Sequence, residues 1–225
     1  MRSLPLVTVH VAQSLDGRVA LDGATTPLST SEGRISAHAA RARHDAVLVG
    51  ASTVRIDDPR LTVREAPGAQ PLRVVLASTL SLPRSAKVLQ PDGRALVIGA
   101  EGRALDGDRR ALESAGVAVA IAAREEDERG GAGRVSIDGA LSVLAERGVR
   151  TLLVEGGSKV VTSFFAAKRV DRLCIEIAMR LLGAPGTPML GALHIAALDQ
   201  APTLANVSVE RLGENVLVRG DVVYA

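Results

Sequence analysis

The chain has almost no aromatic residues and only one cysteine, and both shortages exclude classes of function. Its 225 residues include two Phe, one Tyr and no Trp, so it lacks the stacking platforms that bind single-stranded nucleic acid. Cys174 alone cannot form an intramolecular disulfide, and its place in an apolar run indicates a buried, inert thiol. We therefore expect a cytoplasmic protein with no nucleic-acid partner.

Long apolar runs and a strong excess of one charge are also missing. The longest clean apolar run, residues 117–123, is far too short to cross a bilayer, and the N-terminus shows no signal peptide, so we expect no membrane segment. The 27 basic residues nearly cancel the 25 acidic ones, so charge does not select a nucleic acid. The remaining composition, 47% hydrophobic and 23% charged, is typical of a globular protein.

Short apolar runs alternate with helical segments over most of the chain. Strands are expected at residues 6–12, 46–50, 72–76, 96–99, 117–121, 151–155 and 173–179. Helices are expected at residues 30–43, 51–56, 108–115, 138–147 and 158–167. This alternation predicts an α/β fold with a mainly parallel sheet and helices on both faces, followed by an antiparallel hairpin at residues 207–212 and 216–224. No linker or repeat divides the chain, so we expect one domain over residues 1–225.

The first long helix has a start signal, an apolar stripe and two histidines. Residues 29–32 match the capping box, in which the Ser29 hydroxyl takes an amide and Glu32 reaches back. The expected stripe consists of Ile35, Ala39 and Ala42. His38 and His44 are six residues apart, which does not suit a pair of metal ligands on a helix, so we expect no metal site. His10, in the first strand, is interpreted as a core residue.

Two loops interrupt the alternation. Residues 124–133 combine clustered acidic residues with glycines, which predicts a mobile or disordered loop. Residues 183–188 are rich in glycine and proline and predict a second long loop.

A charged loop directly follows the apolar run at residues 46–50. Residues 53–64 contain adjacent carboxylates, a proline and several arginines. Such a loop after a buried strand exposes chemistry at the carboxyl edge of a sheet, although the residues before Pro59 can also simply end a short helix. Because adjacent residues point in different directions, we assign Asp57 to a pocket and Asp58 to the turn before proline.

A second informative stretch runs from a strand into two glycines and a helix. Gly156 and Gly157 let the backbone approach a ligand, and the first-turn amides of the helix favour an anion such as a phosphate. The stretch matches neither the Rossmann fingerprint nor the Walker loop, and a tight turn without a ligand is the alternative. Glu155 has to be hydrated, paired or used, because burying an unpaired carboxylate is costly.

Arginines near these stretches supply bidentate donors for a phosphate. They are Arg41, Arg55, Arg60 and Arg64. Each of them alone is more typical of a solvated surface, because the whole chain is rich in alanine, arginine and glycine.

Several blocks occur together in a characteristic order. They are residues 14–18, 49–53, 57–64, 71–76, 153–158, 164–165 and 170–173. The Asp-Asp-Pro-Arg-Leu-Thr-Val-Arg and Val-Glu-Gly-Gly blocks in particular resemble the riboflavin-pathway pyrimidine reductases. The resemblance runs from about Leu6 to Leu190 and implies a three-layer fold like that of dihydrofolate reductase. It also implies a homodimer and NADPH-dependent reduction of the ribosylamino group of an aminopyrimidine 5′-phosphate to a ribitylamino group.

The resemblance implies roles for residues at the matching positions. Asp57 is the implied carboxylate at the reacting centre, where a site of this kind also has to hold cofactor and sugar as a near-attack pair. The implied substrate contacts are Thr25, Arg41, Leu61, Arg64 and Glu155, with the two arginines gripping the phosphate. The implied NADPH contacts are Ala12, Thr53, Asp57, Ser78, Gly156, Gly157, Ser158, Lys159 and Val160.

Two departures from the family pattern keep alternatives open. Residues 27–30 read Pro-Leu-Ser-Thr where family members usually carry Trp-Ile-Thr-Gly, so the expected aromatic wall is missing. The upstream deaminase domain of many bacterial members is also absent, so we expect a stand-alone reductase or a paralogue. The alternatives are a reductase of dihydrofolate or another pterin and a non-catalytic NADPH-binding protein. A phosphate clamp at Arg41 and Arg64 has no use for an unphosphorylated pterin, which favours the phosphorylated substrate.

Overall fold

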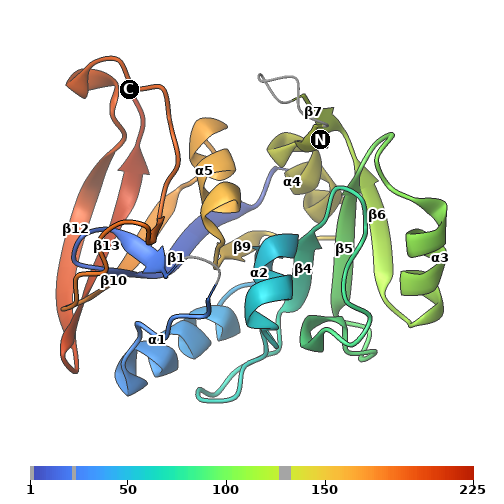
Figure 1. Ribbon diagram of the computed structural model, residues 1–225, viewed down its shortest axis with the longest axis horizontal. Coiled ribbons are helices and arrows are strands. Elements are labelled where there is room, and N and C mark those ends of the chain that lie inside the picture. Colours follow the sequence, from blue (N-terminus) through green and yellow to red (C-terminus); the bar gives the residue numbers. More distant parts are fainter. Residues whose placement is uncertain (1–2, 22–23, 127–132) are drawn as a thin grey trace.

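The computed structural model describes residues 3–21, 24–126 and 133–225, and within them a nine-stranded mixed sheet forms the centre of the molecule (Figure 1). The strand order is β12-β13-β10-β1-β9-β3-β4-β5-β6. Neighbours from β10 to β6 are all parallel, whereas β13 and β12 are antiparallel additions at one edge. The strands are β1 (Leu6–Ser14), β3 (Ala46–Gly50), β4 (Leu72–Leu76), β5 (Ala95–Ala100), β6 (Ala118–Ala122), β9 (Thr151–Val154), β10 (Arg172–Ala178), β12 (Thr203–Leu212) and β13 (Asn215–Val223).

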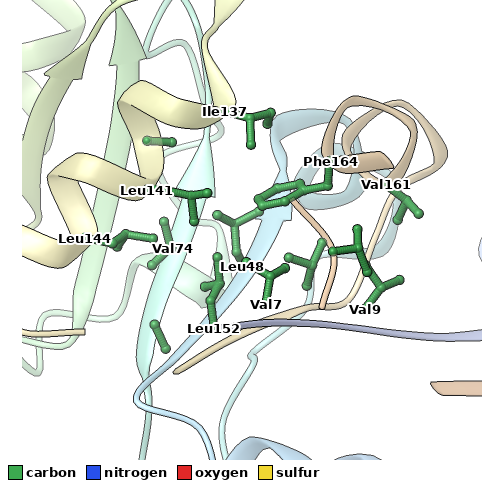
Figure 2. Close-up of a cluster of buried hydrophobic side chains, with 14 of the residues drawn as sticks. Val7, Val9, Leu48, Val74, Ile137, Leu141, Leu144, Leu152, Val161 and Phe164 are labelled. Carbon is green, nitrogen blue, oxygen red and sulfur yellow. The ribbon is translucent and has the colours of Figure 1, made fainter. Parts of the chain in front are cut away.

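Helices cover both faces of the sheet because its central strands are apolar on both sides. They are α1 (Ser31–Ala42), α2 (Ala51–Asp57), α3 (Asp106–Ser114), α4 (Ile137–Glu146) and α5 (Ser158–Ala166). Leu48 of β3 packs with α4 and α5 in the hydrophobic cluster drawn in Figure 2. Val47 and Val49, which alternate with Leu48, belong to a second cluster with Val54 of α2 and Leu112 of α3. Buried on both faces, β3 reads as a continuous apolar run, as strands of parallel sheets do.

Smaller elements complete the described parts of the chain. A short antiparallel pair joins β2 (Arg18–Ala20) to β11 (Thr187–Pro188), and another joins β7 (Arg124–Glu125) to β8 (Arg134–Val135). Single 3₁₀ turns lie at η1 (Lys87–Leu89) and η2 (Leu198–Gln200). None of the helices in the described ranges combines the length and apolar character that a membrane crossing requires.

The predicted fold class is confirmed: a mainly parallel central sheet carries helices on both faces and ends in an antiparallel hairpin. The strands at residues 46–50 and 72–76 have the predicted bounds. The first is an uninterrupted apolar run, whereas the second includes the buried Arg73. The first strand of the hairpin begins at Thr203 rather than at residue 207, since the extra residues carry no alternating pattern.

The start of α1 corrects the predicted capping box. Thr30, one residue beyond Ser29, is the N-cap, and its hydroxyl accepts the N–H of Gly33 at 3.0 Å. The Thr30 N–H donates to the buried carboxylate of Glu176 at 3.0 Å, so Glu32 does not fill the reciprocal place. Asn215 also donates to Glu176, at 2.6 Å. Glu176 lies on β10, 146 residues after Thr30 in the sequence, and fixes the first turn of α1.

The predicted apolar stripe of α1 is also wrong. Ile35 is 50% exposed, and the buried residues of the helix are Gly33 and His38. A Cβ on Gly33 would collide with the Glu176 carboxylate, so the small residue is needed for the helix to approach β10. The buried residues of the helix thus meet polar partners, which hydrophobic periodicity does not detect, while Ala40 packs against the cluster of Val47 and Val49.

The two predicted loops have different outcomes. At the ends of residues 124–133, Arg124 and Glu125 pair with residues 134–135, so this part is a strand rather than a disordered loop. Residues 127–132 lie outside the described residues. At the second loop, the carboxylate of Asp16 accepts the N–H groups of Leu182 and Gly183 at 3.0 and 2.6 Å. These bonds, with one from Ser14, lower the pKa of Asp16 to about 2 and tie the loop to the end of β1.

Candidate active site

The predicted site residues gather at one edge of the sheet. Ala12 lies near the end of β1, Thr53 and Asp57 follow β3 in α2, and Ser78 follows β4. Residues 155–160 follow β9, which lies between β1 and β3. Because these strands are parallel, their carboxyl ends meet at a single edge, which is where open α/β sheets bind ligands (Figure 1).

A buried ion pair dominates this edge. The guanidinium of Arg41 on α1 donates two hydrogen bonds to the carboxylate of Glu155, at 2.6 and 2.7 Å. The two side chains are 14% and 11% exposed. Burial alone would lower the pKa of Arg41, but the Glu155 carboxylate raises it above its usual value. Glu155 is therefore a paired carboxylate.

The ion pair also limits what Arg41 offers to a ligand. Its third nitrogen donates to the carbonyl of Thr62 at 3.1 Å, so each of the three guanidinium nitrogens already has a protein partner. Arg64 differs from Arg41, because its guanidinium is exposed. Within the described residues only one of its nitrogens is bonded, and this nitrogen is 2.6 Å from the Thr62 hydroxyl. The assignment of Arg41 to a phosphate stays a prediction, and Arg64 is the more accessible cation.

A cavity of about 300 Å³ lies beside the ion pair. Its lining includes four predicted residues, Ala12, Arg41, Arg64 and Glu155. His10 and His38 also line it. A larger cavity of about 380 Å³ lies at the opposite, amino edge of the sheet and includes none of the predicted site residues. We take the smaller cavity as the candidate site, because charged groups converge there.

Sequence reasoning missed the two histidines on this cavity wall. His10 on β1 is 7% exposed; burial lowers its pKa, against the opposing effect of the Glu155 and Glu176 carboxylates. His38 lies one helical turn before Arg41, and its Nδ1 accepts the N–H of Arg64 at 2.8 Å. The sequence could have indicated His38, because it lies three residues before Arg41 and therefore on the same helix face.

The adjacent carboxylates turn to different partners, as their neighbouring positions predict. Asp57 accepts the hydroxyl of Thr25 at 2.6 Å, which brings two predicted site residues into contact. Asp58 ends α2 in the left-handed conformation, with φ 41°, and accepts the backbone N–H of Lys87 at 2.8 Å. Its second oxygen is 2.9 Å from the Lys87 ammonium. Asp58 thus joins the loop to η1, while Asp57 stays at the sheet edge.

The glycine turn after β9 has the features expected of a backbone anion site. The N–H of Gly157 donates to the Thr53 hydroxyl at 2.9 Å, which ties α5 to α2. Gly156 has a φ of 120°, and a Cβ built on it would meet no atom within 4 Å. The N-cap residue Gly157 has no side chain to cap α5, and the Val160 N–H donates to the Gly157 carbonyl at 2.9 Å, so among the described residues the N–H groups of Ser158 and Lys159 are those left for an anion.

Three further predicted site residues do not line the cavity. The side chain of Leu61 is 2% exposed and packs in the cluster under α2, so it does not line the cavity. The Ser78 hydroxyl accepts the N–H of Val135 at 3.3 Å. Val160 is packed so closely on Gly50 that a Cβ there would lie 2.7 Å from its methyl group. The ligand contacts assigned to these three residues stay predictions.

Comparison with known proteins identifies a family over almost the whole chain. The model of the RibD C-terminal domain matches residues 5–218. The Riboflavin biosynthesis protein RibD of Aquifex aeolicus is 33% identical over 216 residues, which cover 95% of this chain and 57% of that protein. The chain thus spans little more than half the length of such curated relatives.

Two further relatives match the chain in different ways. The 2,5-diamino-6-ribosylamino-4(3H)-pyrimidinone 5′-phosphate reductase of Archaeoglobus fulgidus is 32% identical over 195 residues, or 82% of this chain and 84% of that protein. The solved structure of Acinetobacter baumannii RibD, form 1, superposes with a TM-score of 0.83 at 26% identity. That match covers 98% of this chain and 58% of the other.

Proposed function

The chain belongs to the RibD C-terminal domain family, and on this basis we propose that it is a reductase of riboflavin biosynthesis. Its substrate is an aminopyrimidine 5′-phosphate whose ribosylamino group is reduced to a ribitylamino group. The Archaeoglobus fulgidus relative, which aligns over 84% of its own length, is named as a reductase of such a phosphate, and this supports the substrate class. Residues 1–225 act as one reductase domain.

The observation that carries the proposal is the set of charged groups around the 300 Å³ cavity. Arg64 is an exposed cation on its wall, as is Arg34, and a guanidinium fork matches the oxygens of a phosphate. Glu155 is held in place by Arg41 through two short bonds. Each carboxylate oxygen keeps lone-pair capacity beyond those bonds, so Glu155 accepts hydrogen bonds from a pyrimidine or sugar.

Asp57 is the group that handles the proton in this proposal. Opening of the ribose ring requires a proton near the ring oxygen, and a positioned carboxyl group supplies such transfer. The Thr25 hydroxyl, 2.6 Å from the Asp57 carboxylate, orients it. Thr25 in turn contacts the carbonyl of Ile56 at 3.3 Å, so both groups stay beside α2.

NADPH is the proposed cofactor, and the turn between β9 and α5 supports this proposal. The uncapped first turn of α5 suits a pyrophosphate, because backbone N–H groups and the helix dipole both favour an anion there. The space beside Gly156 is open, because a Cβ built there would meet no atom within 4 Å, and it leaves room for a ligand to approach the backbone. Thr53 holds the turn through Gly157, while Ser158, Lys159 and Ala12 border the same edge. When bound, the reduced nicotinamide supplies the hydride for the sugar carbon.

We also propose that the chain works as a homodimer. The edge strand β12 has an exposed apolar face that includes Val207 and Val209, at 52% and 65% exposure. Exposed apolar edge strands are ready-made pairing surfaces, and a second copy is the partner that the family resemblance implies.

Turnover assays test the proposed function. The purified chain is incubated with NADPH and, in separate reactions, the diaminopyrimidinone ribosyl phosphate, its deaminated form, dihydrofolate, or no substrate. Oxidation of NADPH is expected with one of the two aminopyrimidine phosphates. If dihydrofolate alone is reduced, the substrate assignment is wrong, and NADPH binding without any turnover would indicate a non-catalytic protein.

A further inference from the structure

The segment that carries Arg64 has no regular secondary structure, and side chains hold its backbone instead. Arg41 donates to the carbonyl of Thr62 at 3.1 Å. Gln70 brackets Val63, accepting its N–H at 2.8 Å and donating to its carbonyl at 2.7 Å. Next in line, His38 accepts the N–H of Arg64 at 2.8 Å and that of Glu65 at 3.3 Å, both through Nδ1. Backbone groups that lack a strand partner need such bonds.

The geometry fixes the protonation state of His38. A ring nitrogen that accepts two N–H groups carries no proton, so the imidazole is neutral with its proton on Nε2. Protonation would place a third N–H against the two backbone donors and break the contact. Of the three side chains that hold residues 62–65, only the histidine titrates near neutral pH.

The charges around His38 come from its own helix, from the segment and from β9. Burial is the main cause that lowers the pKa of His38, whose side chain is only 5% exposed. The cations Arg41 and Arg64 lower it further, while Glu65 and Glu155 raise it. Glu65 is the nearest carboxylate, with an oxygen 3.7 Å from Nε2, and its side chain is 40% exposed.

We propose that neutral His38 is a positioning residue, which holds the backbone of residues 64–65 so that Arg64 faces the cavity and can bind the substrate phosphate. This inference rests on the proposed function in one respect, the use of Arg64 as the phosphate contact. His38 also lines the cavity, but the proposed role requires no contact of its side chain with the sugar or the cofactor. It acts through the position of the arginine.

The sign of the pH dependence follows from the direction of the pKa shift. The neutral form is favoured in the folded protein, so the His38 contact is fully present above the unfolded pKa of about 6.5. It is lost as pH falls through the lower folded pKa. Phosphate affinity through Arg64 therefore declines below pH 6.5 rather than above it.

A direct test follows the backbone amides by NMR between about pH 7.5 and 5, a range that spans the unfolded histidine pKa. In the wild-type chain, the Arg64 and Glu65 amide signals should shift and exchange faster as pH falls, with one common midpoint. The Val63 amide, held by Gln70, is the internal control and should not share this transition. In His38→Asn, whose side-chain oxygen accepts in the place of Nδ1 without titrating, the transition should vanish.

A matched control uses the other histidine beside α1. His44 contacts the carbonyl of Ala40 and the hydroxyl of Thr8, away from residues 62–65. His44→Asn should therefore keep the Arg64 transition. A transition that persists in His38→Asn, or its absence from the wild-type chain, overturns the inference whether or not the protein is a reductase.

Kinetics test the consequence for the substrate. His38→Leu removes the acceptor and should raise KM for the phosphorylated substrate about tenfold, the scale of one lost positioning contact, with kcat and NADPH affinity nearly unchanged. His38→Asn should restore the KM at neutral pH. The substrate phosphate itself titrates near pH 6, and the Asn variant measures that background separately.

These readouts separate two failures. Amide transitions of the expected kind without turnover of any aminopyrimidine phosphate contradict the proposed function and leave the role of His38 standing. Turnover with a kcat loss and an unchanged KM in His38→Leu contradicts the positioning role and leaves the function standing.

Discussion

At the level of single residues, the candidate site separates groups that the sequence places side by side. Asp57 bonds to Thr25, while Asp58 bonds to Lys87 and supports η1. Glu155 and Arg41, in contrast, are 114 positions apart and form the short, nearly buried pair that borders the cavity. Such a pair is retained when its charges are needed, because burying it costs desolvation energy.

Substitution of the two aspartates tests their different roles. Asp57→Asn keeps the shape and the Thr25 contact but cannot exchange a proton, so turnover should fall on the order of a hundredfold with NADPH affinity unchanged. Asp58→Asn is the matched control and should keep turnover, with at most a small loss of stability. Steady-state kinetics and cofactor titration measure both. Equal loss of turnover in the two variants would show that Asp57 only shapes the loop.

The sequence predicts which segments meet at the candidate site, but it does not predict the long-range contacts of His38 and Glu176. Parallel strands bring the segments that follow β3 and β9 to one edge, so strand order alone predicts Glu155 at that edge, although Asp57 does not line the cavity that Glu155 borders. The role of His38 cannot be predicted in this way, because it depends on how an irregular segment 26 residues away folds against α1. The same holds for Glu176, which meets Thr30 from 146 residues further along the chain.

At the level of elements, the turn between β9 and α5 positions the proposed cofactor. Its backbone reaches the required path only through Gly156, whose φ of 120° is rarely adopted by residues with a side chain. The carbonyl of Gly156 accepts the N–H of Gly50 at 3.3 Å, which joins the turn to the end of β3. A short helix beginning at Ser158 then presents its amides to the edge.

A substitution in this turn should affect cofactor binding more than anything else. Gly156→Ala forces an unfavourable backbone conformation, at a cost of roughly 1–3 kcal/mol, and fills the space beside the turn. NADPH affinity should fall at least about tenfold.

Gly107→Ala, in α3 and with no atom within 4 Å of the added Cβ, is the control. It should leave affinity unchanged and not reduce stability, because alanine favours helices. Thermal unfolding and NADPH titration distinguish the outcomes, and unchanged affinity in Gly156→Ala would remove the turn from the proposed site.

Element boundaries show where sequence patterns lose information. β3 and β4 begin and end as predicted because both are short, largely apolar segments, although β4 contains the buried Arg73. α1 does not pack through Ile35, since its buried contacts are polar and tied to β10 and to the Arg64 segment. The pair β7 and β8 is too short, at two residues each, for any periodicity to appear.

At the scale of the whole molecule, the sheet has two unlike edges. β6 lies at one edge near α3, and β12 forms the other, at the opposite end of the molecule (Figure 1). The β12 edge carries the exposed valines, whereas much of the charged surface of β13 and β12 is tied in ion pairs such as Arg219 with Glu210. This distribution favours β12 as the surface that meets a second copy.

Light scattering coupled to size exclusion tests the proposed homodimer. The wild-type chain should elute with twice the mass of its 23.3 kDa monomer. Val209→Lys places a charge on the β12 face and should shift the mass toward the monomer at low micromolar concentration. Leu105→Lys, at a 59% exposed position beside α3, adds the same charge at the other end and should not. A wild-type monomer, or equal effects of the two variants, would contradict the assignment of β12.

Isotope transfer is the most direct test of the central claim, that this edge reduces a phosphorylated sugar carbon. The chain is supplied with NADPH stereospecifically deuterated at the transferable position of the nicotinamide, in parallel reactions for the two faces, together with the aminopyrimidine ribosyl phosphates. The account predicts that one of the two labelled cofactors yields a ribitylamino product with a single deuterium on the former C1′, seen by mass spectrometry and NMR. A ribitylamino product without deuterium in either reaction, or no such product from any of the phosphorylated substrates, would contradict it.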